Sequence, residues 1–237
     1  PVNGATLTQE EFNSINPNEA VDITTISLTG KITNETLGII ASSFTSLEEL
    51  DLSDMDGTIP ANTFAGMKSL VTVTLPDVET VEPGTFKDCE NLTTVTIPPS
   101  VNTIGDDAFN GCSSLNSITL TGINSIGAGA FNGCNNLTSI NLNAPSAAPA
   151  AKKRNLSRAI QENGFSPKAF DGVNPNCLIL VDDGVDVPQT QEGNFIVTTI
   201  GDVTEVIDGE TVVRQGRIYF ANGNINLQAG YPLSIAN

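Results

Sequence analysis

The amino-acid sequence predicts an α/β solenoid, in which short parallel strands alternate with helical or 3₁₀ turns along one axis. The first observation is a repeat: Phe64, Phe86, Phe109 and Phe131 follow one another at spacings of 22, 23 and 22 residues. The second is that apolar residues recur at fixed offsets from each phenylalanine. A unit of this size cannot bury its apolar face alone, so the copies are expected to stack on one another.

The fixed offsets define the apolar columns of the stack. Each phenylalanine is followed three residues later by Met67, Cys89, Cys112 or Cys134, and six residues later by Leu70, Leu92, Leu115 or Leu137. Nine and eleven residues later come the pairs Val73/Leu75, Val95/Ile97, Ile118/Leu120 and Ile140/Leu142. These pairs predict a strand with every second residue in the core. The segment between Phe and Met or Cys predicts a helical or 3₁₀ turn.

Two of the copies closely resemble the BspA-like leucine-rich repeat: IGDDAFNGCSSLNSITL (Ile104 to Leu120) and IGAGAFNGCNNLTSINL (Ile126 to Leu142). The resemblance covers about residues 41–187 and begins with a reduced copy, in which Ala41 takes the Phe position and Phe44 the Met/Cys position. It implies a leucine-rich repeat fold in a secreted or surface-attached bacterial protein. It also implies adhesion or protein binding, since better-known members of the family bind host extracellular proteins.

The chain is expected to have three parts: an N-terminal cap at 1–40, leucine-rich repeats at 41–187 with an inserted loop and helix at about 144–166, and a small antiparallel β segment at 188–237. In the cap, Thr8 and Glu11 predict a capping box at the start of a short helix, and a strand follows. The β segment is either complete or the start of a further domain.

The repeat resumes after the insertion in a shortened form. Phe170 and Val173 fall in their columns, but Leu178 and Leu180 arrive one residue early for the strand pair. Further along, Asp208-Gly209 and Asn222-Gly223 are dipeptides that favour tight turns between antiparallel strands.

Composition excludes several classes of function. The chain has no His and no Trp, and its net charge is −17. Without His, catalytic triads and His-ligated zinc are excluded, so the chain is expected to be non-enzymatic, with no cofactor and no metal. The negative charge disfavours nucleic acid as a partner. No apolar run is long enough for a membrane span, so no direct membrane insertion is expected. A signal or anchor segment is absent from the given residues, and the expected location is extracellular or at the cell surface.

The cysteines are predicted to be buried thiols. Three of them share a column with Met67, and a column shared by Met and Cys indicates apolar core. Side chains stacked in one column point in parallel, which disfavours disulfides between them. Cys177 lies outside this column, and its state stays open.

The candidate binding face is formed by the residues that alternate with the buried ones along the predicted strands. These outward positions are Thr72, Thr74, Thr94, Thr96, Ser117, Thr119, Ser139 and Asn141. Stacked strands would place them about 4.8 Å apart, as a hydroxyl-rich ladder on the face that solenoids commonly use for binding. The alternative is that threonine simply suits exposed strand positions.

A second candidate is a basic cluster within the insertion, formed by Lys152, Lys153, Arg154 and Arg158. In so acidic a chain, it could serve as a docking site for an acidic partner or for an acidic patch on a second copy. The alternative is a solvated helix that packs on the solenoid through Leu156 and Ile160.

The sequence therefore predicts a non-enzymatic surface or secreted binding module, with a protein ligand such as an extracellular-matrix component. Two alternatives stay open: a glycan-binding protein of a nutrient-capture system, and a structural spacer. The hydroxyl ladder favours the glycan alternative, whereas the scarcity of Trp and Tyr weakens it.

Overall fold

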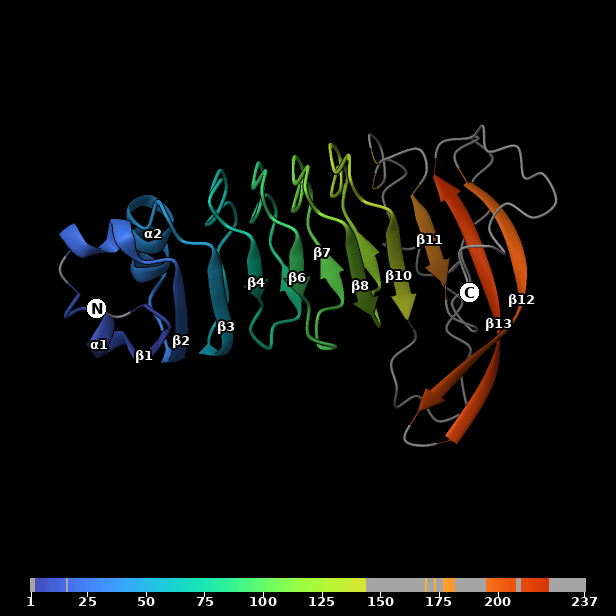
Figure 1. Cartoon of the computed structure of the whole chain (residues 1–237), viewed down its shortest axis with the longest axis horizontal. Helices are drawn as coiled ribbons and strands as arrows, with labels where there is room; N and C mark the ends of the chain where they lie inside the picture. Colours follow the sequence, from blue (N-terminus) through green and yellow to red (C-terminus); the bar gives the residue numbers. More distant parts are fainter. Residues whose placement is uncertain are drawn as a thin grey trace.

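The computed structural model describes residues 3–15, 17–143, 169, 173, 177–181, 195–207 and 210–221. The strands follow one another in a row along the long axis of the molecule (Figure 1). The elements are β1 (Ala5–Leu7), α1 (Gln9–Phe12), the 3₁₀ helix η1 (Pro17–Asp22), β2 (Thr25–Lys31), α2 (Asn34–Ser43), β3 (Glu49–Asp56), β4 (Thr72–Thr74), β5 (Thr80–Val81), β6 (Thr94–Thr96), β7 (Thr103–Ile104), β8 (Ser117–Thr121), β9 (Ser125–Ile126), β10 (Ser139–Asn143), β11 (Leu178–Val181), β12 (Phe195–Ile207) and β13 (Glu210–Ala221).

The predicted stack of parallel strands is confirmed. One sheet has the order β1-β2-β3-β4-β6, and all of its strand pairs are parallel. Its register keeps equivalent residues side by side, so that Val73 of β4 pairs with Leu50 of β3 and with Val95 of β6. Strands β1 and β2 belong to the region expected as an N-terminal cap. They extend this sheet on the N-terminal side of the first repeat copy, which contains β3.

A second sheet has the order β8-β10-β11-β13-β12. Neighbouring strands β6 and β8 share no strand pairing within the described part of the chain, although they lie side by side. The copy that contains β6 is also the one with the longer spacing, 23 residues from Phe86 to Phe109. Its extra residue falls in the arc between β6 and β7.

A third, smaller sheet forms where each copy turns back. It contains β5, β7 and β9, which pair in parallel, with Val81, Ile104 and Ile126 facing the core. This sheet bridges the break between the two larger sheets, because β7 pairs with both of its neighbours. The stack is therefore continuous on this side where it is interrupted on the other.

The core is built from the columns that the sequence predicts. All four repeat phenylalanines are fully buried, as are the three cysteines and the four leucines of the next two columns. Successive phenylalanine rings stack with centroids 5.6 Å apart, from Phe64 to Phe131. Ile97 is the exception among the strand pairs, since it is only partly buried.

The predicted helical or 3₁₀ turns contain 3₁₀-type hydrogen bonds but form no continuous helix. Around Phe86, the N–H groups of Lys87 and Cys89 donate to carbonyls three residues earlier, at 3.0 and 3.2 Å. The N–H groups of Phe86 and Asp88 donate instead to the next copy, to Ala108 O at 2.9 Å and Asn110 O at 2.7 Å. Alternate amides thus close the turn and join it to its neighbour, which no α-helix could do.

The N-terminal region contains the predicted capping box. Thr8 accepts from the Glu11 backbone, and the Glu11 carboxylate accepts from Thr8 N–H at 2.8 Å. At the first copy, α2 replaces the turn, so Ile40 is buried there while Ala41, which the sequence places in the Phe column, is only partly buried. The Phe44 ring stacks on Phe12, with centroids 5.8 Å apart.

The interpretation of the copy after the insertion as shortened is wrong. In β11, Ile179 and Val181 pair with Ile140 and Leu142 of β10, so the strand pair arrives at its usual offset from Phe170. Leu178 pairs with Ser139 instead. The sequence misled because four apolar residues in succession, LILV, fit either register.

The C-terminal segment adds an antiparallel hairpin to the sheet. Strands β12 and β13 flank Asp208-Gly209, as predicted, and β13 pairs antiparallel with β11. Strand β12 is long and has an irregularity in its pairing with β13 between Thr199 and Asp202. The second predicted turn, Asn222-Gly223, lies outside the described residues.

Candidate functional site

The predicted hydroxyl ladder lies on the large parallel sheets, as rows of side chains in register. Thr72 pairs with Thr94 and Thr74 with Thr96 across β4 and β6, and Ser117 and Thr119 pair with Ser139 and Asn141 across β8 and β10. Four of the eight are exposed, namely Thr94, Thr96, Ser117 and Thr119, and the others are half-buried. The Asn141 side chain donates to the Thr119 hydroxyl at 3.3 Å.

The break between β6 and β8 falls at the centre of this ladder. No backbone hydrogen bond joins these two strands within the described residues. The four exposed ladder residues flank the break, two on each side. The most accessible part of the candidate face therefore includes strand edges whose peptide groups have no partner on the neighbouring strand.

The surface changes in charge along the stack. Residues 108–143 contain no Asp, Glu, Lys or Arg, so the copies that carry β8, β9 and β10 have an uncharged polar surface rich in Asn, Ser and Thr. The copies before them are strongly acidic. On β3, the outward positions next to the ladder are Glu49 and Asp51, and Glu49 accepts a hydrogen bond from Thr25 Oγ1 at 3.4 Å.

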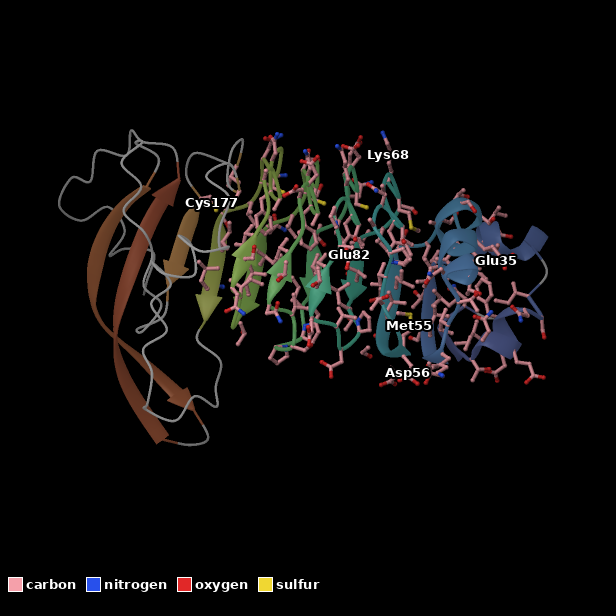
Figure 2. The ribbon with its side chains drawn as sticks, turned by 180° about the vertical axis from the view of Figure 1, so that it is seen from behind. Glu35, Met55, Asp56, Lys68, Glu82 and Cys177 are labelled. Carbon is pink, nitrogen blue, oxygen red and sulfur yellow. The ribbon has the colours of Figure 1, made fainter. Side chains whose placement is uncertain are left out.

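The two lysines of the described repeats are paired with acids of the following copy. Lys68 Nζ lies 2.7 Å from Glu90 Oε1, and Lys87 Nζ lies 3.2 Å from Asp107 Oδ2. A hydrogen bond from Asn110 lowers the pKa of Asp107, and Lys87 lowers it further. In Figure 2, Lys68 lies at the edge where the turns project, and Asp56 lies at the opposite edge. These ion pairs leave little positive potential on the turn edge.

All four cysteines are buried, and none of them forms a disulfide. The thiols of Cys89, Cys112 and Cys134 each donate to the backbone carbonyl of a phenylalanine in the previous copy, at 3.1 to 3.2 Å. Burial raises the pKa of Cys89 and of Cys134 to about 12, and it raises the pKa of Cys112 as well. Cys177, whose state the sequence left open, also forms no disulfide, and burial raises the pKa of its thiol to about 12.

One row of candidate residues was missed. Thr80, Thr103 and Ser125 form a second series of in-register hydroxyl side chains, on the small sheet of β5, β7 and β9. They are half-buried, and Thr103 Oγ1 donates to Asn102 Oδ1 at 2.8 Å. The recurrence of Thr or Ser just before Val81, Ile104 and Ile126 was the available signal.

Other candidate chemistry finds no support in the described part of the chain. It contains no group of three or more His, Cys, Asp or Glu side chains arranged to hold a metal ion. No helix there is long and apolar enough to cross a membrane. The predicted docking cluster of Lys152, Lys153, Arg154 and Arg158 lies outside the described residues.

Stacked parallel strands, columns of buried Leu, Phe and Cys, and turns bonded from copy to copy define a leucine-rich repeat solenoid. The family model of the BspA type leucine rich repeat region matches residues 36–148 in six copies. These residues therefore form a BspA-type leucine-rich repeat region, which makes up just under half of the chain.

Among the solved structures that resemble the chain, three are each 22% identical to it in sequence. A leucine rich cell surface protein from Faecalibacterium prausnitzii matches over 60% of this chain and 44% of its own, with a TM-score of 0.38. A leucine-rich repeat protein from Bacteroides ovatus matches over 58% and 37%, with a TM-score of 0.34. The leucine rich repeat protein of T. pallidum matches over 50% and 58%, with a TM-score of 0.33.

The match therefore spans less than two thirds of each of these three structures. No curated protein sequence matches the chain.

Proposed function

We propose that this chain is a non-enzymatic binding module of a bacterial surface or secreted protein, and that it binds a protein ligand through the hydroxyl ladder on its large sheets. The family supports the general role, since leucine-rich repeats serve as interaction scaffolds. The choice of an extracellular-matrix protein as ligand follows from the adhesive character that the resemblance implies.

The observation that carries the proposal is the exposed centre of the ladder. Thr94, Thr96, Ser117 and Thr119 are exposed on adjacent strands, and each hydroxyl can both donate and accept a hydrogen bond. A buried core of stacked copies holds these strands in place, so little order would have to be gained on binding. Pre-organisation of this kind reduces the entropic cost of association.

The test compares two pairs of substitutions in the same chain. Thr96→Arg combined with Thr119→Arg places two bulky cations at exposed positions of the ladder. Binding to a panel of immobilised extracellular-matrix proteins should then fall at least tenfold, because the added side chains prevent close approach over the sheet.

The matched control is Thr80→Arg combined with Thr103→Arg, which adds the same charge and bulk to the small sheet. The melting temperature of both variants confirms that they are folded. If the control loses as much binding as the ladder variant, or if the ladder variant binds as well as the parent, the ladder is not the ligand face.

A glycan ligand is the second candidate, and the uncharged surface of residues 108–143 favours it. Amide and hydroxyl groups without nearby charge suit a neutral polysaccharide. Measuring binding to a glycan array as well as to the matrix panel distinguishes a glycan ligand from a protein ligand. The variant with Thr96→Arg and Thr119→Arg should lose binding to whichever of these ligands the parent binds. Binding to neither collection would contradict both and support a structural spacer.

The basic cluster at 152–158 stays a prediction of its own. Reversal of Lys152, Lys153, Arg154 and Arg158 to Glu should abolish any salt-sensitive binding to acidic proteins or self-association. Light scattering and a pull-down at low and high salt measure this effect. Unchanged association would indicate that the cluster is only a solvated surface.

A further inference from the structure

Asn-Gly pairs recur in this chain and are chemically reactive. The chain has five, of which Asn3-Gly4, Asn110-Gly111 and Asn132-Gly133 lie in the described residues. In such a pair, the glycine amide nitrogen can attack the asparagine side-chain carbonyl carbon. Glycine hinders this ring closure least because it has no Cβ. Whether the reaction proceeds in a folded protein depends on how firmly both groups are held.

Two of the three pairs are held by hydrogen bonds. Gly4 N–H donates to Thr25 O at 2.9 Å, and Asn3 Oδ1 accepts from the backbone N–H groups of Thr24 and Thr25. Gly111 N–H donates to Asn132 O at 2.7 Å.

The side chain of Asn110 is fixed as well. Its Nδ2 donates to Asp107 Oδ1 at 2.8 Å, and the residue is half-buried. In this pair, the attacking nitrogen and the amide under attack are both held by partners. The same is true of Asn3-Gly4.

Asn132-Gly133 is the same turn one copy later, but among the described residues its asparagine side chain lacks the restraint that holds Asn110. The position of Asp107 is taken here by Gly129, which has no carboxylate to hold the Asn132 side chain. Asn132 is exposed. Gly66 and Gly111, the counterparts of Gly133, each donate to the next copy, whereas Asp171, the equivalent acceptor position for Gly133 N–H, lies outside the described residues.

We propose that Asn132 is a site of spontaneous deamidation in the folded protein, and that Asn110 and Asn3 are protected from it. The Gly133 nitrogen forms a bond to Asn132 Cγ, and the bond from Cγ to Nδ2 breaks. Ammonia leaves with the former amide proton of Gly133, and a succinimide remains. Water then opens either carbonyl of the ring, which gives an aspartyl or an isoaspartyl residue at position 132.

The product would change this part of the solenoid in two ways. It places a negative charge in the uncharged surface of residues 108–143. The isoaspartyl form also routes the main chain through Cγ and displaces the carbonyl that accepts from Gly111 N–H. Loss of that bond removes one restraint on Asn110-Gly111, so modification should spread in order, from Asn132 to Asn110.

The test is a time course of the folded full chain at mildly alkaline pH, followed by peptide mapping by mass spectrometry and enzymatic methylation of isoaspartyl residues. Asn132 should be converted severalfold faster than Asn110, and conversion of Asn110 should lag behind it. In denaturant the two rates should converge, because both sites then have the same local sequence, Phe-Asn-Gly-Cys.

The control variant is Asn132→Gln, whose longer side chain closes the ring far more slowly. It should abolish modification at position 132 and leave Asn110 protected throughout the time course. Equal rates at Asn110 and Asn132 in the folded chain, or no conversion of Asn132 while the denatured chain reacts at both, would overturn the proposal.

Discussion

At the scale of single residues, close contact between copies decides which side chains fit. Two positions in every turn, two residues before and two after each phenylalanine, have a positive φ and hold only Gly, Asn or Asp. The side chain of Asp107 lies over Gly129 of the next copy, where an added Cβ would meet Asp107 Oδ1 at 2.5 Å. In the described copies, Asn62 and Asp107 at this position are each followed by glycine in the next copy.

Gly105 tests this close packing without the complication of a positive φ. A Cβ at Gly105 would lie 2.6 Å from the backbone nitrogen of Pro83, and a backbone atom cannot easily move away. Gly105→Ala should therefore lower the free energy of unfolding by about 1–3 kcal/mol, measured by urea denaturation.

The matched control is Gly38→Ala in helix α2, where an added Cβ meets nothing within 4 Å. It should be neutral or stabilise the protein by about 0.5–1 kcal/mol, because alanine is the better helix former. A Gly105→Ala protein as stable as the Gly38→Ala protein would contradict the observed packing of the turns.

The buried thiols give stability a dependence on pH. Their pKa values are raised above the ordinary 9.0, to about 12 for Cys89, so the folded state favours the protonated form. The stabilisation is complete below pH 9 and is lost as the pH rises towards the folded value. Each such thiol should then reduce stability by up to about 1.4 kcal/mol per pH unit in this window.

Urea denaturation under reducing conditions at several pH values between 8 and 10.5 measures the slope. The double variant Cys89→Ala, Cys134→Ala should show a smaller slope than the parent, whatever its stability at pH 8. An identical slope would mean that these thiols do not contribute to the pH dependence.

At the scale of elements, the sequence predicted the structure where the same residue type recurs in every copy. It did not predict features that depend on contacts between neighbouring copies. The spacing of Phe, Cys and Leu predicted the buried columns and the strands, because burial alone selects those residues. The turns were expected to be helical or 3₁₀, and they do contain 3₁₀-type hydrogen bonds. Their alternate N–H groups bond to the next copy, which a single copy cannot reveal. Strand β2 joins the parallel sheet through Ile26 and Leu28, although no phenylalanine turn precedes it.

The arc between β6 and β7 is the irregular element of the stack. It holds Ser100, whose hydroxyl is buried and has no hydrogen-bond partner among the described residues. Ser100→Ala should therefore be neutral or stabilise the protein by about 1 kcal/mol, because an unsatisfied buried hydroxyl is costly. Thermal unfolding measures the effect.

Thr85→Ala serves as the comparison, since the Thr85 hydroxyl is also buried but donates to Glu82 O at 2.7 Å. This substitution should destabilise the protein by about 1 kcal/mol. If Ser100→Ala costs as much as Thr85→Ala, the Ser100 hydroxyl has a partner in solution.

At the scale of the whole molecule, the described repeats form one stack with one continuous core, and their surface is divided by charge. The acidic surface lies towards the N-terminal end, and the uncharged surface begins at Ala108. The candidate ladder crosses this boundary at the break between β6 and β8. The charge boundary is visible in the sequence, but the break and its coincidence with the exposed threonines required the structure.

Neighbouring copies stabilise one another through the shared core, and a substitution at Phe109 tests this most directly. Its ring is fully buried between Phe86 and Phe131, at 5.6 Å from each. Phe109→Ala should cost about 3–5 kcal/mol, and hydrogen exchange should show reduced protection in the copies on both sides before the N-terminal cap is affected.

Val21→Ala, at a position that is 45% exposed, is the control and should change stability by less than about 0.5 kcal/mol. The decisive measurement is the thermal unfolding of the Phe109→Ala chain beside this control. The stacked core predicts a melting temperature lower by well over about 5 °C. A melting temperature within about 1 °C of the parent would contradict it.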